Sequence, residues 1–122
     1  MAGQVYDHRR TVEAKTANYT LTQADSGKIF TNRGDTDAIT FTLPAVSDTY
    51  TGVNYRFYVV ADQDLVVAGT ADELVTFNCN LATSVALSTT SEQIGGGVEV
   101  VCDGTSWLVF PLAEETQTLT VA

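Results

Sequence analysis

Apolar and polar residues alternate with a period of two along much of this chain, which is the spacing of strands with one buried face. The alternation is clearest in Asn18–Thr22 and in Ile39–Leu43. Pro44 ends the second segment, because proline cannot donate a hydrogen bond to a sheet ladder. No window of about eleven or more residues carries an apolar stripe with helical spacing. The pattern therefore predicts an all-β protein.

The same criterion predicts further strands along the chain. Asp62–Asp64 is expected to join two of them, Tyr55–Val60 and Leu65–Ala68, as a hairpin. Gln23–Gly27 is expected to form a tight turn, and Arg33–Asp35 a loop tip. The remaining predicted strands are Lys28–Asn32, Leu74–Phe77, Ser84–Ser88 and Leu119–Val121.

The strongest local signal is the run from Val98 to Phe110. Two β-rich segments, Val98–Cys102 and Trp107–Phe110, flank Asp103–Ser106, in which Asp-Gly supplies the positive φ that tight hairpins need. Gly95–Gly97 gives the chain freedom to turn into this unit. We predict a β-hairpin here.

These elements fit one domain, because the 122 residues are enough to bury a core without metal or disulfide staples. We expect residues 18–122 to form a single small sandwich or barrel of about eight to ten short antiparallel strands. Met1–Ala17 has only Val5, Tyr6 and Val12 as larger apolar residues. This first segment is therefore expected to be an extended N-terminal arm.

Charge divides the chain unevenly. All six basic residues lie within the first 56 positions, where they balance the acidic ones, and the net charge of -9 belongs to Phe57–Ala122. Affinity for a phosphate backbone needs clustered Lys and Arg, so we expect no nucleic-acid partner. The split predicts a body with an acidic side and a basic arm. The six basic residues are Arg9, Arg10, Lys15, Lys28, Arg33 and Arg56.

The sequence contains few residues or motifs that are typical of catalytic, cofactor-binding or metal-binding sites. Its single histidine, His8, lies in the predicted arm, no phosphate-binding or nucleophile motif occurs, and we predict no catalytic residues, no cofactor, no metal site and no enzymatic activity. Cys79 and Cys102 could form a disulfide, but two buried free thiols are the favoured expectation. No apolar segment approaches the roughly 20 residues of a membrane span, and no signal-peptide core is present, so a soluble, unsecreted chain without membrane contact is expected.

Three weaker motifs have ordinary structural interpretations. Arg33–Asp35 spells an adhesion tripeptide and Asn18–Thr20 a glycosylation acceptor, but both are short enough to arise by chance. Calcium held by Asp62, Asp64 and Asp72 is an alternative to solvated turn carboxylates, although no complete calcium-loop motif supports it.

Two stretches resemble a module of small tailed-phage structural proteins. The first runs from Tyr19 to Phe30 and continues through Ile39–Pro44, and the second is Val101–Trp107, similar to the closing hairpin of those proteins. The module occurs in head decoration (cement) proteins and in head-fibre and tail-fibre proteins. The resemblance implies an all-β virion protein with no catalytic residues to carry over.

The resemblance and the short length favour a bacteriophage capsid decoration protein, made in the host cytoplasm and placed on the outer capsid surface. We expect a homotrimer across capsomer boundaries whose partner is the major capsid protein. The alternative is a fibre or receptor- or carbohydrate-binding module, with Trp107, Tyr55 and Tyr58 as candidate stacking faces, although the favoured interpretation of these three side chains is that they are core aromatics in strands. The residues expected to contact the capsid all lie in the arm: Tyr6, Arg9, Arg10, Val12 and Lys15.

Overall fold

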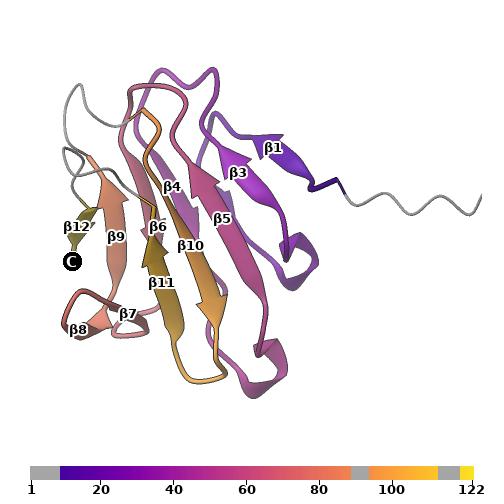
Figure 1. Cartoon of the computed structure of the whole chain (residues 1–122), viewed down its shortest axis with the longest axis vertical. Coiled ribbons are helices and arrows are strands. Elements are labelled where there is room, and N and C mark those ends of the chain that lie inside the picture. Colours follow the sequence, from indigo (N-terminus) through magenta and orange to yellow (C-terminus); the bar gives the residue numbers. More distant parts are fainter. Residues whose placement is uncertain (1–8, 89–93, 113–118) are drawn as a thin grey trace, which may run out of the picture.

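The computed structural model describes residues 9–88, 94–112 and 119–122, and it contains two β-sheets (Figure 1). The larger sheet has seven strands in the order β1-β3-β5-β10-β11-β7-β8, and the smaller has five in the order β12-β9-β6-β4-β2. The larger comprises β1 (Val12–Ala14), β3 (Ile29–Thr31), β5 (Asn54–Tyr58), β10 (Gly97–Cys102), β11 (Trp107–Pro111), β7 (Leu74–Thr76) and β8 (Cys79–Ala82). The smaller comprises β12 (Leu119–Val121), β9 (Ser84–Leu87), β6 (Leu65–Ala68), β4 (Ile39–Thr42) and β2 (Tyr19–Thr20).

The prediction of an all-β protein is confirmed. The helices of the described residues are two short 3-10 turns, η1 (Gln23–Asp25) and η2 (Asp48–Tyr50). The first of these occupies the turn expected at Gln23–Gly27, and the second lies in the loop after Pro44.

One core lies between the sheets, because alternate residues of both point into it. Phe41 of the smaller sheet is 5.0 Å from Phe57 and 5.6 Å from Phe30 of the larger, measured between ring centroids. Trp107 and Tyr55 are also fully buried, with ring centroids 5.6 Å apart. These aromatic side chains account for much of the apolar burial that drives folding.

The first six strands alternate between the sheets: β1, β3 and β5 lie in the larger sheet, and β2, β4 and β6 in the smaller. Strands that return to the same sheet after each crossing run parallel, as β1–β3, β3–β5, β2–β4 and β4–β6 do. The expected all-antiparallel arrangement is therefore wrong for this half of the chain. The expected hairpin of Tyr55–Val60 with Leu65–Ala68 is also wrong, since Asp62–Asp64 connects β5 in one sheet to β6 in the other.

The hairpin predicted between Val98 and Phe110 is confirmed as the antiparallel pair β10–β11. The Asp103 carboxylate accepts hydrogen bonds from the backbone N–H groups of Thr105 (2.9 Å) and Ser106 (2.8 Å), and Gly104 has a φ of 94°. These bonds lower the pKa of Asp103, the one from Ser106 contributing most. The turn residues thus stabilise the hairpin that the sequence indicated.

Candidate binding surface

Part of the segment expected to be an arm belongs to the larger sheet. Strand β1 runs parallel to β3, and the flanking backbone adds hydrogen bonds from Lys15 N–H to Thr31 O and from Ile29 N–H to Thr11 O, each 2.9 Å long. Residues 12–14 are therefore an edge strand of the domain. Any free arm must lie before them.

Ion pairs hold β1 against the turn that precedes β3. The Glu13 carboxylate lies 2.6 Å from Lys28 Nζ and 3.3 Å from Lys15 Nζ. Hydrogen bonds from Lys28 first, and from Lys15, hold the pKa of Glu13 below its usual value. Lys28 Nζ also donates to Asp25 Oδ1 at 3.0 Å, and its two carboxylate partners, Glu13 and then Asp25, raise its pKa.

Asp25 is the buried centre of this cluster. Its Oδ2 accepts hydrogen bonds from the Tyr19 hydroxyl (3.0 Å), the Thr22 N–H (3.0 Å) and the Thr22 hydroxyl (3.3 Å). Burial alone would raise the pKa of Asp25, but the bonds from Thr22, Lys28 and Tyr19 together lower it. A carboxylate with this many donors is a structural anchor.

The five residues expected to contact the capsid do not have the same kind of position in the structure. Tyr6 lies outside the described residues. Arg9 and Arg10 are exposed immediately before β1, and Val12, with 59% of its surface exposed, lies on β1. Lys15 Nζ lies 4.0 Å above the Tyr19 ring as well as beside Glu13, so this side chain contributes to the anchoring of β1.

The acidic residues after Phe57 that the structure describes do not gather on one side of the domain. Asp62 and Asp64 follow the end of β5, whereas Asp103 follows the end of β10, which runs antiparallel to β5. The two groups therefore lie at opposite ends of the larger sheet. For the described residues the expected single acidic side is wrong, and their acidic groups after Phe57, apart from Glu99, lie in loops.

The distribution of charged residues leaves one surface of the domain without net charge, and the sequence did not lead us to predict this surface. We call it the outer face of the larger sheet, made of the residues that alternate with the buried ones on its strands. Tyr58 and Phe110 are 45% and 48% exposed, and Leu81 on β8 is 63% exposed. The described residues at these outward positions, of which Thr31 and Gly97 are themselves buried, are Val12, Ala14, Ile29, Thr31, Asn54, Arg56, Tyr58, Val75, Leu81, Gly97, Glu99, Val101, Leu108 and Phe110.

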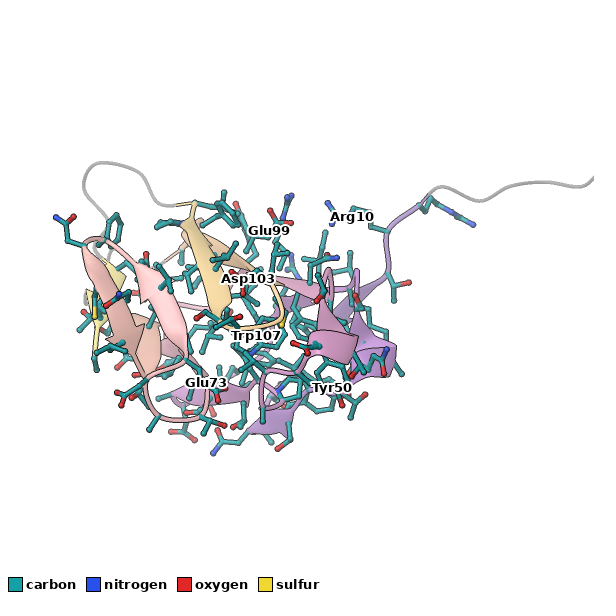
Figure 2. All side chains as sticks on the ribbon, turned by 90° about the horizontal axis from the view of Figure 1, so that it is seen from below. Arg10, Tyr50, Glu73, Glu99, Asp103 and Trp107 are labelled. Atoms are coloured by element: carbon teal, nitrogen blue, oxygen red, sulfur yellow. The ribbon has the colours of Figure 1, made fainter. Side chains whose placement is uncertain are left out.

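Its two charged residues pair with each other at the centre of the sheet. Arg56 and Glu99 are register partners on β5 and β10, and Arg56 Nη2 lies 3.3 Å from Glu99 Oε2. Figure 2 shows Glu99 on the same side of the molecule as Arg10, with Trp107 in the interior. The strand residues that make up the face therefore carry no net charge.

Two of the three aromatic residues considered for sugar stacking are unavailable. Trp107 and Tyr55 are fully buried; Trp107 donates from Nε1 to Pro44 O at 3.0 Å, and the Tyr55 hydroxyl donates to Thr22 O at 2.7 Å. Burial also raises the pKa of Tyr55. The favoured interpretation as core aromatics is therefore confirmed for Trp107 and Tyr55, and Tyr58, which is 45% exposed, is the one of the three that remains a candidate for stacking.

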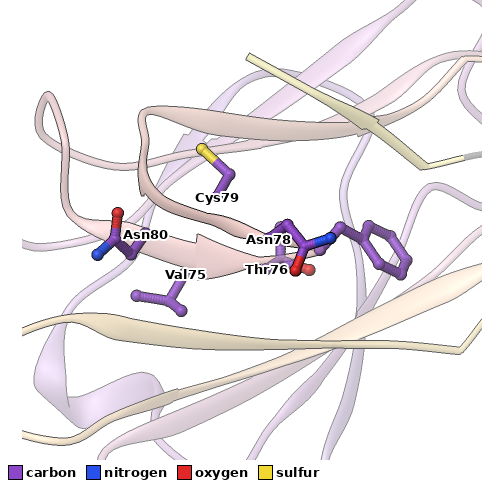
Figure 3. A pocket seen from close by; sticks show the side chains of 6 residues that line it. Val75, Thr76, Asn78, Cys79 and Asn80 are labelled. Carbon is purple, nitrogen blue, oxygen red and sulfur yellow. The ribbon is translucent and has the colours of Figure 1, made fainter.

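A hollow of about 370 Å³ lies on the β7–β8 hairpin and is lined by residues 75–80 (Figure 3). Val75 and Cys79 point to opposite sides of the hairpin. The Thr76 hydroxyl is buried without a hydrogen-bond partner, and Phe77 at the tip is exposed. The lining of the hollow consists of apolar, amide and hydroxyl groups together with the Cys79 thiol.

The other sequence motifs have structural roles in the described residues. Arg33 and Gly34 form a turn closed by Asp35 N–H bonding to Asn32 O at 2.9 Å, and Asp35 is only 9% exposed, which argues against adhesion. No three Asp, Glu, His or Cys side chains of the described residues group as metal ligands, so Asp62, Asp64 and Asp72 do not form the calcium site considered. Cys102 is buried and Cys79 half-buried, both as free thiols.

No protein-family model matches this chain, and a search of curated protein sequences returns no match either. Within the described residues, no helix combines the length and apolar content of a membrane span. The surfaces described above are therefore the basis for assigning a function.

Proposed function

We propose that this protein is a structural protein of a bacteriophage virion that decorates and stabilises the outside of the capsid as a homotrimer across capsomer boundaries. Its partner is the major capsid protein, and it needs no cofactor, nucleic acid or membrane. The two sheets form a sandwich, since each strand pair of the described residues lies within one sheet and the core lies between the two. The protein is made in the host cytoplasm and acts on the virion surface, without enzymatic activity.

The observation that carries this proposal is the anchoring of the N-terminal segment. Strand β1 is fixed by backbone hydrogen bonds and by the Glu13–Lys28 contact, so the basic pair Arg9–Arg10 begins at a defined edge of the domain. A short basic segment projecting from a rigid, net acidic body is suited to a shallow acidic site on a neighbouring protein. The resemblance to phage decoration modules supports the identity of that neighbour.

Stabilisation follows from added contact area. Each standard interface buries about 1,600 Å² in total, and linked attachment points strengthen one another because the second binds at a high effective concentration. A trimer that attaches through three N-terminal segments would therefore resist separation of capsomers more strongly than one copy.

Binding to purified, undecorated shells tests the proposal. The substitution Arg10→Glu should weaken binding by about tenfold or more, because it places like charges in contact with an acidic site. Arg33→Glu is the matched control, since it changes an exposed arginine to glutamate in the turn before β4 and should bind as the wild type does. Equal shell occupancy by the wild type and both variants would contradict attachment through the N-terminal segment.

A receptor- or glycan-binding module of a phage fibre is the alternative function. The hollow on the β7–β8 hairpin favours it, because exposed Phe77 lies there beside the amides of Asn78 and Asn80, and an aromatic face with amide groups suits sugar binding. Phe77→Ala should then abolish binding to host surface glycans without lowering the melting temperature. Unchanged glycan binding by that variant would exclude this site.

A further inference from the structure

The outer face of the larger sheet has the composition of a buried surface. A sheet with one face in water normally alternates apolar and polar residues, and the outward positions are the polar ones. Here Tyr58, Val101, Leu108 and Phe110 occupy outward positions on the three central strands. Large contiguous apolar patches of this kind are uncommon on monomers and mark interaction sites.

We propose that this face binds the same face of a second copy of the chain. The proposal goes beyond the proposed function, because contact between two copies of one face has two-fold symmetry and joins chains in pairs, separately from the contacts that would make a trimer. It does not depend on that function, since it is argued from the residues of the face itself.

Charge selects a second copy as the occupant. Each chain carries a net charge of -9, so two copies repel unless they meet through surfaces free of net charge. The outer face of the larger sheet fulfils this condition because Arg56 and Glu99 neutralise each other. The acidic residues Asp62, Asp64, Asp72, Glu73 and Asp103 lie in loops away from it.

The outer face of the smaller sheet is also uncharged but offers less binding energy. Its outward residues are small or carry hydroxyl groups: Thr40, Thr42, Val66, Ala68, Ser84, Ala86 and Thr120. Hydroxyl groups are well hydrated, and removing them from water without new hydrogen bonds is unfavourable. Burying Tyr58, Phe110, Leu108 and Leu81 is favourable because these side chains are apolar and large.

The size of the face is also adequate. The seven strands contain 29 residues, and at about 3.3 Å per residue and about 4.8 Å between strands they cover an area of the order of 450 Å² before the relief of the side chains is counted. A standard interface takes about 800 Å² from each partner, so this face supplies somewhat more than half of it.

The central ion pair has unused capacity for a second copy. Arg56 makes one contact with Glu99, at 3.3 Å, whereas a guanidinium carries five N–H donors. Glu99 likewise uses one oxygen in this contact. When two such faces meet, Arg56 of one copy can pair with Glu99 of the other, which sets their register.

The first test measures association of the purified full-length protein by sedimentation velocity. Phe110→Glu places a charge among apolar side chains and should weaken self-association by about 100-fold or more. Thr42→Glu adds the same charge at an exposed outward position of the smaller sheet and should leave association unchanged. Thermal melting of both variants checks that the fold is retained.

The second test asks whether the occupant is another copy of the same chain. Arg56→Glu alone gives two neighbouring carboxylates on the face, and Glu99→Arg alone gives two neighbouring cations. Each variant should associate at least about tenfold more weakly than the wild type because like charges meet, and a mixture of the two should associate again as a hetero-oligomer. Only contact between two copies of this face predicts that recovery.

Several outcomes would overturn the inference. They are a monomeric wild type at concentrations of tens of micromolar or more, an oligomer that Phe110→Glu leaves intact, and a mixture of charge variants that does not associate. Shell binding distinguishes these failures from failure of the proposed function. If the protein self-associates through this face but does not bind shells, only the proposed function is contradicted. If Phe110→Glu leaves the oligomer intact and the protein binds shells, only the proposed interface is contradicted.

Discussion

At the scale of single residues, the cluster around Asp25 shows how a small number of polar groups joins the N-terminal segment to the core. Asp25 receives bonds from Tyr19, Thr22 and Lys28, and Lys28 also contacts Glu13 on β1. No pattern in the sequence indicated that these five residues meet. Their spacing has no period, and the contacts depend on β1 and β3 being neighbours.

This cluster predicts a loss of stability in acid. The pKa values of Asp25 and Glu13 are lowered from ordinary values of 3.8 and 4.5, so the unfolded chain binds protons more readily than the folded one. Their contribution to stability is therefore complete above those ordinary values and is lost as the pH falls through the lower, folded values. The free energy of unfolding should decline steeply below about pH 4.5.

Asp25→Asn isolates the buried member of the cluster. It should lower the free energy of unfolding at neutral pH by about 1.5 to 3 kcal/mol, because charged hydrogen bonds are lost, and should make the decline in acid shallower. Asp62→Asn removes an exposed carboxylate and serves as the control. Urea titrations at a series of pH values measure both effects, and parallel pH profiles for Asp25→Asn and the wild type would contradict this role.

Gly97 is a second residue whose role the sequence did not indicate. Gly95–Gly97 was predicted only to let the chain turn, and Gly95 does have a φ of 89°. Gly97 lies within β10, where an added Cβ would come 2.4 Å from the carbonyl oxygen of Phe57. The glycine is needed for close approach of two backbones, which composition alone cannot reveal.

Gly97→Ala should therefore lower the free energy of unfolding by about 3 kcal/mol, since backbone of β5 must shift to accept it. Gly27→Ala is the matched comparison, because Gly27 has a φ of 87° with no neighbouring atom within 4 Å of the added Cβ. Its cost should be about 1 kcal/mol, from backbone strain alone. Equal urea midpoints for the two variants would show that the contact with Phe57 is unimportant.

At the scale of elements, the sequence predicted local pairing well and pairing between distant strands poorly. The β10–β11 hairpin follows from residues within the turn, including Asp103 and Gly104. The segment between β5 and β6 carries turn residues as well, but the chain there crosses between the sheets, which pack about 10 Å apart. Alternation reports that a strand has one buried face, and it does not report in which sheet the strand lies.

The strands β1 and β8 were missed because their sequences are weak strand formers. Each has four residues or fewer; β1 has Glu13 at its centre, and β8 contains Asn80. Both lie at the edges of the larger sheet, where tertiary contacts such as the Glu13–Lys28 pair decide the pairing.

The position of β1 predicts where the N-terminal segment can be removed without harm. Deleting residues 2–10 should leave the free energy of unfolding within about 0.5 kcal/mol of the wild type, because β1 is retained. Deleting residues 2–15 removes β1 and its ladder and should cost about 1 to 3 kcal/mol, from several lost hydrogen bonds. Thermal unfolding measures both, and equal stability of the two truncated proteins would place the domain boundary after Lys15.

At the scale of the whole molecule, the sequence contained a pattern that indicated the apolar outer face of the larger sheet, but the prediction did not use it. Val98–Cys102 and Trp107–Phe110 are nearly continuous apolar runs, whereas strands with one wet face alternate. Continuous runs are typical of strands covered on both sides. Strand β1, by contrast, could not be located from the sequence, which predicted its residues to be part of a basic arm.

The balance of charge and apolar area predicts how self-association depends on salt. Two chains of net charge -9 repel each other, while the proposed interface is apolar apart from one neutralised ion pair. Raising the ionic strength from about 0.01 M to about 0.15 M shortens the screening length from roughly 30 Å to 8 Å, which suppresses the long-range repulsion and leaves the apolar contacts intact. Association of the wild type should therefore become stronger with salt.

The mixture of the Arg56→Glu and Glu99→Arg variants should gain less from added salt, because salt also screens the attraction between the oppositely charged faces of the two variants. Sedimentation equilibrium across this range measures both, and wild-type association that weakens with salt would mean that complementary charges, and not the apolar face, hold the copies together.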